Sequence, residues 1–94
     1  MPRTMIAMLT LALLAAAPAL AQPTGLTPNC QGGWQRYQAA QGRPKAFALA
    51  PGKACGWWQS NDAARTLGDI RDKAVNQCRT SGGNEACKLV DVQR

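Results

Sequence analysis

Small and large side chains alternate with period two over residues 45–50, which read Lys-Ala-Phe-Ala-Leu-Ala. Successive side chains of a strand point to opposite faces. The alternation therefore predicts a strand with Phe47 and Leu49 towards a core and the three alanines on the other face. Pro51 and Gly52 follow, and this pair favours a turn because proline fixes φ and glycine accepts positive φ. We expect the chain to reverse direction after residue 50.

Residues 54–59, Ala-Cys-Gly-Trp-Trp-Gln, are predicted to return as the second arm of a hairpin. On this arm Cys55 and Trp57 share one face, so Trp58 must point to the other face. The alternation makes Trp58 the aromatic residue that is expected to be exposed.

The strongest helical periodicity covers residues 62–79. Charged and amide side chains occupy one side of this segment, and Ser60 or Asn61 can cap its start. Glycines 82 and 83 are expected to end it. The apolar side chains recur at helical spacing and form one stripe: Ala63, Leu67, Ile70, Ala74 and Cys78.

Residues 86–92 are rich in β-branched and apolar side chains, which predicts a closing strand. Residues 22–33 are rich in Pro, Thr and Gly and are expected to form a flexible lead-in, with a helical turn between Trp34 and Ala40. The chain is therefore predicted to hold one small α+β domain over residues 34–94. In it a β-hairpin is followed by one amphipathic helix and a closing strand, and the helix packs on one face of the sheet.

Residues 1–21 have the features of a signal peptide. Arg3 precedes an uncharged apolar run of about 13 residues, and Ala19 and Ala21 are the small residues that a signal peptidase recognises. A membrane-spanning helix needs roughly 20 apolar residues, so the run is too short to span a bilayer. We expect cleavage before Gln22 and an exported protein, periplasmic or extracellular, with no transmembrane anchor.

Four cysteines, Cys30, Cys55, Cys78 and Cys87, are present in the chain. An even number of cysteines in a short exported chain predicts two disulfides, for which three connectivities exist. Cys78–Cys87 is favoured because these residues flank a turn, and Cys30–Cys55 follows by elimination. A zinc site is the alternative, but the spacing contains no C-x-x-C element and the chain has no histidine.

These segments resemble a family of small exported bacterial modules that is catalogued as a domain of unknown function. The resemblance rests on the Lys-Ala-Phe-Ala strand, on Cys-Gly-Trp at 55–57, and on Cys78 and Cys87, and it covers about residues 45–92. It implies a hairpin, a helix and a closing strand, with paired cysteines at the helix end and the last strand. It implies no catalytic residues. The chain departs from the family pattern in Cys30 and in its double tryptophan.

Little in the composition favours catalysis. Without histidine, no serine or cysteine has an imidazole base to activate it. Asp69 and Asp72 form the one close pair of carboxylates, and their spacing is typical of a solvated helix face. We therefore expect no enzymatic activity, no cofactor and no metal site.

The charge distribution is more informative. The chain has a net charge of +6, and residues 22–61 contain four basic residues and no acidic one. Basic residues beside tryptophans can bind an anionic component of the envelope or an acidic protein. The candidate binding surface consists of Trp58, Arg43, Lys45 and Lys53.

Two functions fit these features. The first is an exported, non-enzymatic binding module of the bacterial envelope. The second is a cationic envelope-active protein, such as a small antimicrobial or an inhibitor. Export makes nucleic acid an improbable partner for either.

Overall fold

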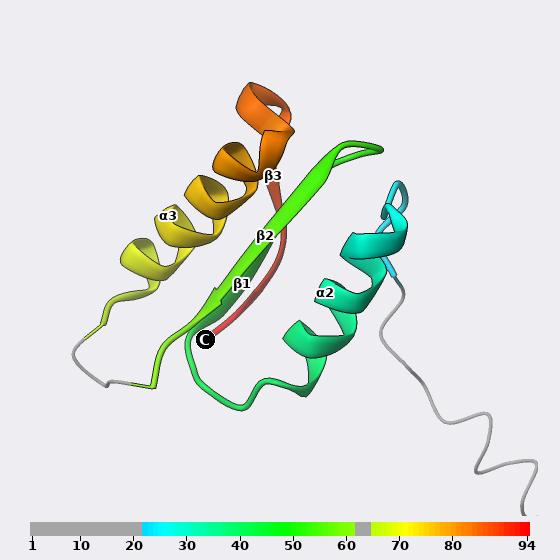
Figure 1. The fold of residues 1–94 in the computed structure, drawn as a ribbon. Coiled ribbons are helices and arrows are strands. Elements are labelled where there is room, and N and C mark those ends of the chain that lie inside the picture. The colour runs from blue at the N-terminus through cyan, green and yellow to red at the C-terminus, as the bar shows by residue number, and fades with distance from the viewer. Residues whose placement is uncertain (1–21, 62–64) are drawn as a thin grey trace, which may run out of the picture.

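The computed structural model describes residues 22–61 and 65–94. Their strands form one antiparallel sheet in the order β2-β1-β3, with β1 at Lys45–Ala50, β2 at Ala54–Gln59 and β3 at Lys88–Gln93. Two helices, α2 and α3, lie on opposite sides of this sheet (Figure 1). The predicted signal peptide and Ala63 lie outside the described residues.

The hairpin is formed as the alternation predicts. Phe47 pairs with Trp57 and Leu49 with Cys55, so these side chains share one face, whereas Ala46 pairs with Trp58 on the other. The turn is closed by a hydrogen bond from Lys53 N to Ala50 O (2.9 Å), and Gly52 takes a φ of +71°. The predicted class, an α+β domain with a hairpin, a helix and a closing strand, is confirmed.

Helix α3 (Leu67–Cys78) covers the sheet face that carries the small side chains. The buried cluster on this face consists of Ala46, Ala48 and Ala50 of β1 with Ile70, Ala74 and Cys78 of α3. A side chain on Gly56 of β2 would collide with the helix backbone, because a Cβ there would lie 2.7 Å from Ala74 O. The short side chains therefore let α3 pack closely against the sheet.

The predicted start of this helix is wrong. The helix was expected from residue 62, with Ser60 or Asn61 as the cap, but α3 begins at Leu67. Thr66 is the N-cap, since its Oγ1 accepts a hydrogen bond from Asp69 N (3.1 Å). A threonine hydroxyl satisfies a free amide of the first turn, and Asp69 in that turn favours the helix dipole. These local interactions place the start within the predicted periodic segment.

Helix α2 (Pro28–Ala39) covers the opposite face of the sheet. Its Trp34 and Tyr37 are buried against Phe47 and Leu49. Residues 28–33 were predicted to belong to a flexible lead-in, and this is wrong because they form the first half of α2. Thr27 Oγ1 caps the helix by accepting from Cys30 N (3.2 Å), and Pro28 occupies the first turn, where its missing N–H costs nothing.

Each helix is linked to the sheet region by a disulfide. Cys30 on α2 is bonded to Cys55 on β2, and Cys78 at the end of α3 is bonded to Cys87 just before β3. The connection after α3 consists of a π-helical turn (Arg79–Gly83) and a 3₁₀ turn (Asn84–Ala86). The favoured connectivity is confirmed, and two disulfides in a small domain are consistent with an oxidising, exported location.

Among residues 22–61 and 65–94, no helix is long and apolar enough to cross a membrane.

Candidate binding groove

A groove of about 400 Å³ runs along the outer edge of β2, between α2 and α3. Figure 1 shows β2 between the two helices, with β3 on the far side of β1. The hairpin lines the groove from Lys53 to Trp58, and the Cys30–Cys55 disulfide forms part of its wall. The helical sides are lined by Thr27, Asn29, Cys30, Gly33 and Arg36 around α2 and by Gln77 and Ser81 at the end of α3.

The lining of this groove is basic. Arg36 approaches from α2 and Lys53 from the hairpin turn, and no acidic residue lies among the lining residues. Within the described part of the chain, neither side chain has an ion-pair partner, because the one ion pair there joins Arg65 to Asp69. Two cations that face one open groove without a counter-charge attract an anionic ligand.

Trp58 adds an exposed aromatic surface at one end of the groove. Its side chain is 40% exposed, and the Lys73 ammonium lies 5.4 Å from its ring centroid. A smaller hollow of about 250 Å³ adjoins the groove there, because both are lined by Trp58 and Gln77. Lys73 lines this hollow, so the basic character continues along α3.

Of the four predicted surface residues, the structure brings Trp58 and Lys53 together in the groove. Arg43 is not among the residues that line the groove. It precedes the first residue of β1, whereas Lys53 follows the last, so a six-residue strand of roughly 20 Å separates them. The exposed Arg43 guanidinium donates hydrogen bonds to Ala40 O and Gly42 O (both 3.1 Å).

The prediction that Lys45 belongs to the binding surface is wrong. Lys45 is 1% exposed, on the same sheet face as Phe47. Its Nζ donates hydrogen bonds to three carbonyl oxygens at the end of α2: Tyr37 O (2.6 Å), Gln38 O (3.2 Å) and Ala40 O (2.8 Å). Burial, and to a lesser degree the charge of Arg43, lowers the pKa of Lys45 below its usual value. The ammonium satisfies helix-end carbonyls and is not available to a ligand.

Tyr37 extends this buried network to β3. Its hydroxyl donates a hydrogen bond to Asp91 Oδ2 (2.7 Å), and the Lys45 ammonium lies 4.7 Å from its ring centroid. Burial and the hydrogen bond to Asp91 raise the pKa of Tyr37 well above its usual value. The network connects α2, β1 and β3, so its role is to hold one helix on the sheet.

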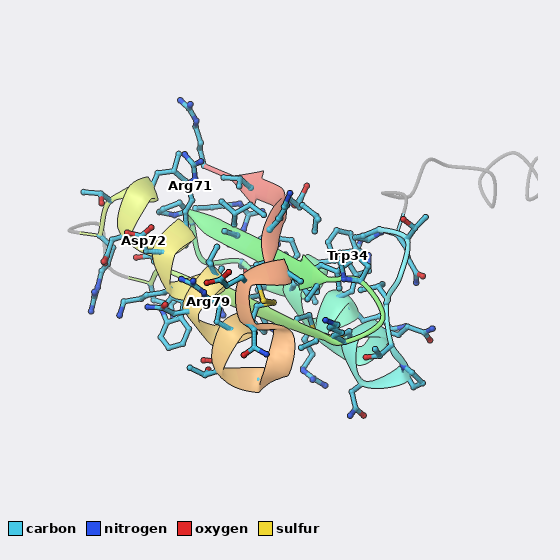
Figure 2. All side chains as sticks on the ribbon, turned by 90° about the horizontal axis from the view of Figure 1, so that it is seen from above. Trp34, Arg71, Asp72 and Arg79 are labelled. Atoms are coloured by element: carbon cyan, nitrogen blue, oxygen red, sulfur yellow. A yellow bond between two sulfur atoms is a disulfide. The ribbon has the colours of Figure 1, made fainter. Side chains whose placement is uncertain are left out.

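Another hollow, of about 360 Å³, lies on the α2 side of the sheet and is less suited to an anion. Its lining includes Trp34, Leu49, Val90 and Asp91 and no basic residue. Figure 2 shows Trp34 on this side, away from Arg71 and Asp72 on α3. The buried indole Nε1 of Trp34 has no hydrogen-bond partner among the described residues.

The groove contains few groups that can do acid–base chemistry. Its lining, within the described residues, includes no carboxylate and no free thiol, since both of its cysteines are in a disulfide. The Asp69 carboxylate lies outside the groove and pairs with Arg65 at 2.8 Å. The described residues also contain no cluster of three acidic or cysteine side chains that could hold a metal ion.

Arg36 is the basic residue of the groove that the predicted binding surface did not include. Asn29, Gly33 and Arg36 are spaced by four and three residues, so they lie on one side of a helix. That spacing identifies Arg36 as a groove residue only when the helix is known to begin at Pro28. Gly32 and Gly33 are poor helix formers, so the sequence pattern did not indicate a helix there.

No protein-family model, no curated protein and no solved structure matches this chain. The resemblance to the exported bacterial modules therefore stays a prediction, and the function has to be argued from the groove.

Proposed function

We propose that the protein is an exported, non-enzymatic binding module of the bacterial envelope, and that it takes an anionic ligand in the groove between α2 and α3. One observation carries the proposal. Arg36 and Lys53 face the same open groove, and neither has an ion-pair partner in the described part of the chain. An uncompensated pair of cations next to aromatic side chains is a favourable surface for a ligand that brings its own carboxylates, sulfates or phosphates.

The proposed location, periplasmic or extracellular, rests on two independent features. Residues 1–21 have the composition of a signal peptide, and the two disulfides are stable in an oxidising compartment. Intact-mass measurement of the exported protein tests this location. A chain that begins at Gln22, with cysteines that react only after reduction, is the expected result.

The experiment that tests the groove compares two double variants of equal net charge. Arg36→Glu with Lys53→Glu reverses both groove cations, whereas Arg71→Glu with Lys88→Glu reverses two exposed cations outside the groove. Binding of polyglutamate and of dextran sulfate is followed by tryptophan fluorescence. We expect the groove variant to weaken binding by about tenfold or more at low salt, and the control variant to change it by about twofold or less. Equal loss in both variants would show binding through net charge alone and would contradict the proposal.

Lys45→Met tests whether Lys45 has a structural role, in contrast to the proposed binding role of Lys53. Because the Lys45 ammonium is buried on α2 carbonyls, its loss is expected to lower thermal stability and to leave polyglutamate binding unchanged. A Lys45 variant that keeps its stability but loses binding would return Lys45 to the binding surface.

A cationic envelope-active protein is the second candidate. It is favoured by the exposed Trp58 beside Lys73, since a tryptophan next to a cation suits an anionic membrane surface. Leakage of dye from phosphatidylglycerol vesicles distinguishes the two candidates. A binding module leaves the vesicles intact, whereas an envelope-active protein releases the dye and loses this activity on Trp58→Ala.

A further inference from the structure

We propose that the ligand is an extended polypeptide segment with carboxylate side chains, which adds as a fourth strand to the outer edge of β2. This inference rests on the proposed function and goes further, because it specifies both the chemical class of the ligand and the main-chain interaction that holds it.

The first argument is the direction of the β2 backbone groups. Antiparallel strands alternate hydrogen-bonded and non-hydrogen-bonded pairs. Ser60 N donates to Pro44 O (2.9 Å), so Pro44 and Ser60 form a hydrogen-bonded pair. Ala46–Trp58 and Ala48–Gly56 lie two and four residues further along the register, so they are hydrogen-bonded pairs as well. The N–H and C=O groups of Cys55 and Trp57 therefore point away from β1, into the groove.

These outward groups are available to a ligand. The described residues supply no hydrogen-bond partner for the backbone of Cys55 or Trp57, although both residues line the groove. Unpaired N–H and C=O groups of an edge strand are a template for pairing with another extended chain. A ligand that pairs with them satisfies backbone groups that otherwise depend on water.

The second argument is the shape of the groove. Its floor follows the strand from Lys53 to Trp58, which corresponds to roughly 20 Å of extended chain. The helices flank this floor, so an added strand contacts α2 with one set of alternate side chains and α3 with the other. On the α3 side Gln77 and Ser81 are exposed and polar. The open volume of about 400 Å³ between the helices is the space that an added strand would enter.

The positive charge of the groove favours an acidic ligand. Arg36 and Lys53 favour a segment with carboxylates at alternate positions. The same two cations oppose pairing of β2 with β2 of a second copy, because such a dimer brings four like charges together. An acidic peptide is therefore preferred over self-association.

The other edge of the sheet is less suited to strand addition. The register of β3 against β1 shifts between Phe47 and Ala48, whereas β2 pairs with β1 without interruption. Bulges of this kind are one means by which proteins protect edge strands from pairing. The Val90 side chain is 44% exposed on β3, but the hollow that it lines contains no basic residue.

The test uses a capped eight-residue peptide of alternating Glu and Val, measured by calorimetry against the oxidised protein. Two isomers carry N-methyl groups on alternate residues, one isomer for each edge of the peptide strand. Because a paired strand uses only one of its edges, we expect one isomer to lose about tenfold or more in affinity and the other to bind as the parent peptide does. We also expect Arg36→Glu to weaken the parent peptide and Arg71→Glu to leave it unchanged.

The remaining outcomes separate this inference from the proposed function. If both isomers bind like the parent, the groove recognises carboxylates without strand pairing, and the inference is wrong while the proposed function stands. The same conclusion follows if dextran sulfate binding depends on Arg36 whereas peptide binding does not. If neither probe depends on Arg36 and Lys53, both proposals fail. Concentration-dependent dimerisation that the peptide does not reverse would instead assign the β2 edge to a second copy of this chain.

Discussion

The two faces of the sheet are packed in opposite ways. On the α2 face, β1 contributes Lys45, Phe47 and Leu49, and the aromatic side chains of α2 fill the space between helix and sheet. On the α3 face, the same strand contributes only alanines, and Gly56 of β2 lets the helix backbone come close. One strand with alternating large and small residues thus supports a helix on each side.

This difference shows what each helix depends on. Helix α2 is held by side-chain volume and by a buried polar network, so it should be sensitive to the removal of atoms. Helix α3 is held by close backbone approach, so it should be sensitive to the addition of atoms. The two helices form the walls of the groove, and the opposite packing modes fix their positions on either side of β2.

The largest expected effect is the loss of Phe47. Its ring is fully buried, with centroids 5.1 Å from Trp34 and 5.4 Å from Tyr37. Phe47→Ala is expected to lower the free energy of unfolding by about 3–5 kcal/mol. Ala48→Gly on the α3 face should cost about 0.5–1 kcal/mol, since it removes one methyl group from a strand. Urea denaturation measures both, and equal losses would contradict the proposed difference between the faces.

Removal of the disulfides should affect the α2 face more than the α3 face. Cys30–Cys55 closes a loop with a sequence separation of 25, and Cys78–Cys87 one of 9. Chain-entropy estimates give a loss of about 3.5 kcal/mol for the first and about 2.5 kcal/mol for the second. Paired Cys→Ala variants, compared by thermal unfolding, test this order. A greater loss from the shorter loop would show that native packing, not chain entropy, sets the contribution.

Adding one carbon atom to the α3 face should be unfavourable. Gly56→Ala places a Cβ against the backbone of Cys78 and Ala74, so α3 must move and stability should fall by about 1–3 kcal/mol. Gly68→Ala is the matched control, because a Cβ at that position of α3 meets no packing neighbour within 4 Å among the described residues. It should stabilise the protein by up to about 1 kcal/mol. A neutral Gly56→Ala would mean that α3 packs less closely than described.

A smaller effect than that of Gly56→Ala is expected in the polar network on the α2 face. Tyr37→Phe removes the hydrogen bond to Asp91 and should cost about 1–2 kcal/mol. Because folding raises the pKa of Tyr37, the unfolded chain loses this proton first as the pH rises, and stability falls above about pH 10. Tyr37 is the one tyrosine of the chain, so tyrosinate absorbance reports it alone. We expect no ionisation before unfolding, and a normal titration near pH 10 in the folded protein would contradict the buried network.

The sequence was sufficient to predict the hairpin and the packing of α3. Period-two alternation in β1 and the turn at Gly52 are local signals, and the stripe that includes Ile70 and Ala74 has a strong helical period. The pairing of Cys78 with Cys87 also follows from a local feature, the turn between them. These predictions needed no knowledge of how distant segments pack.

Helix α2 could not be predicted in full, because its local signal is weak. Gly32 and Gly33 are poor helix formers, and α2 is stabilised by distant contacts: the bond of Cys30 to Cys55 and the burial of Trp34 and Tyr37 on the sheet. The segment before it is anchored as well, since Gly52 N donates to Gly25 O (2.8 Å). Tertiary contacts thus override the propensity of this segment.

The candidate site could not be predicted in full for the same reason, because it depends on contacts between distant segments. Lys45 belongs to the face of Phe47 and Leu49 by period two, but its burial became evident only with the end of α2 in place. The groove itself depends on the positions of both helices. Net charge led to the prediction of an anionic ligand, and three-dimensional packing was needed to show that Arg36 and Lys53 line one groove.

Amide hydrogen exchange of β2, measured by NMR with and without the Glu–Val peptide, tests strand addition most directly. In the free protein the amides of Gly56 and Trp58 should be protected by β1, whereas those of Cys55 and Trp57 should exchange rapidly because they point into the groove. The account predicts that the peptide slows exchange at Cys55 and Trp57 by about tenfold or more and changes Gly56 and Trp58 far less. Peptide binding that leaves the Cys55 and Trp57 amides unprotected would contradict it.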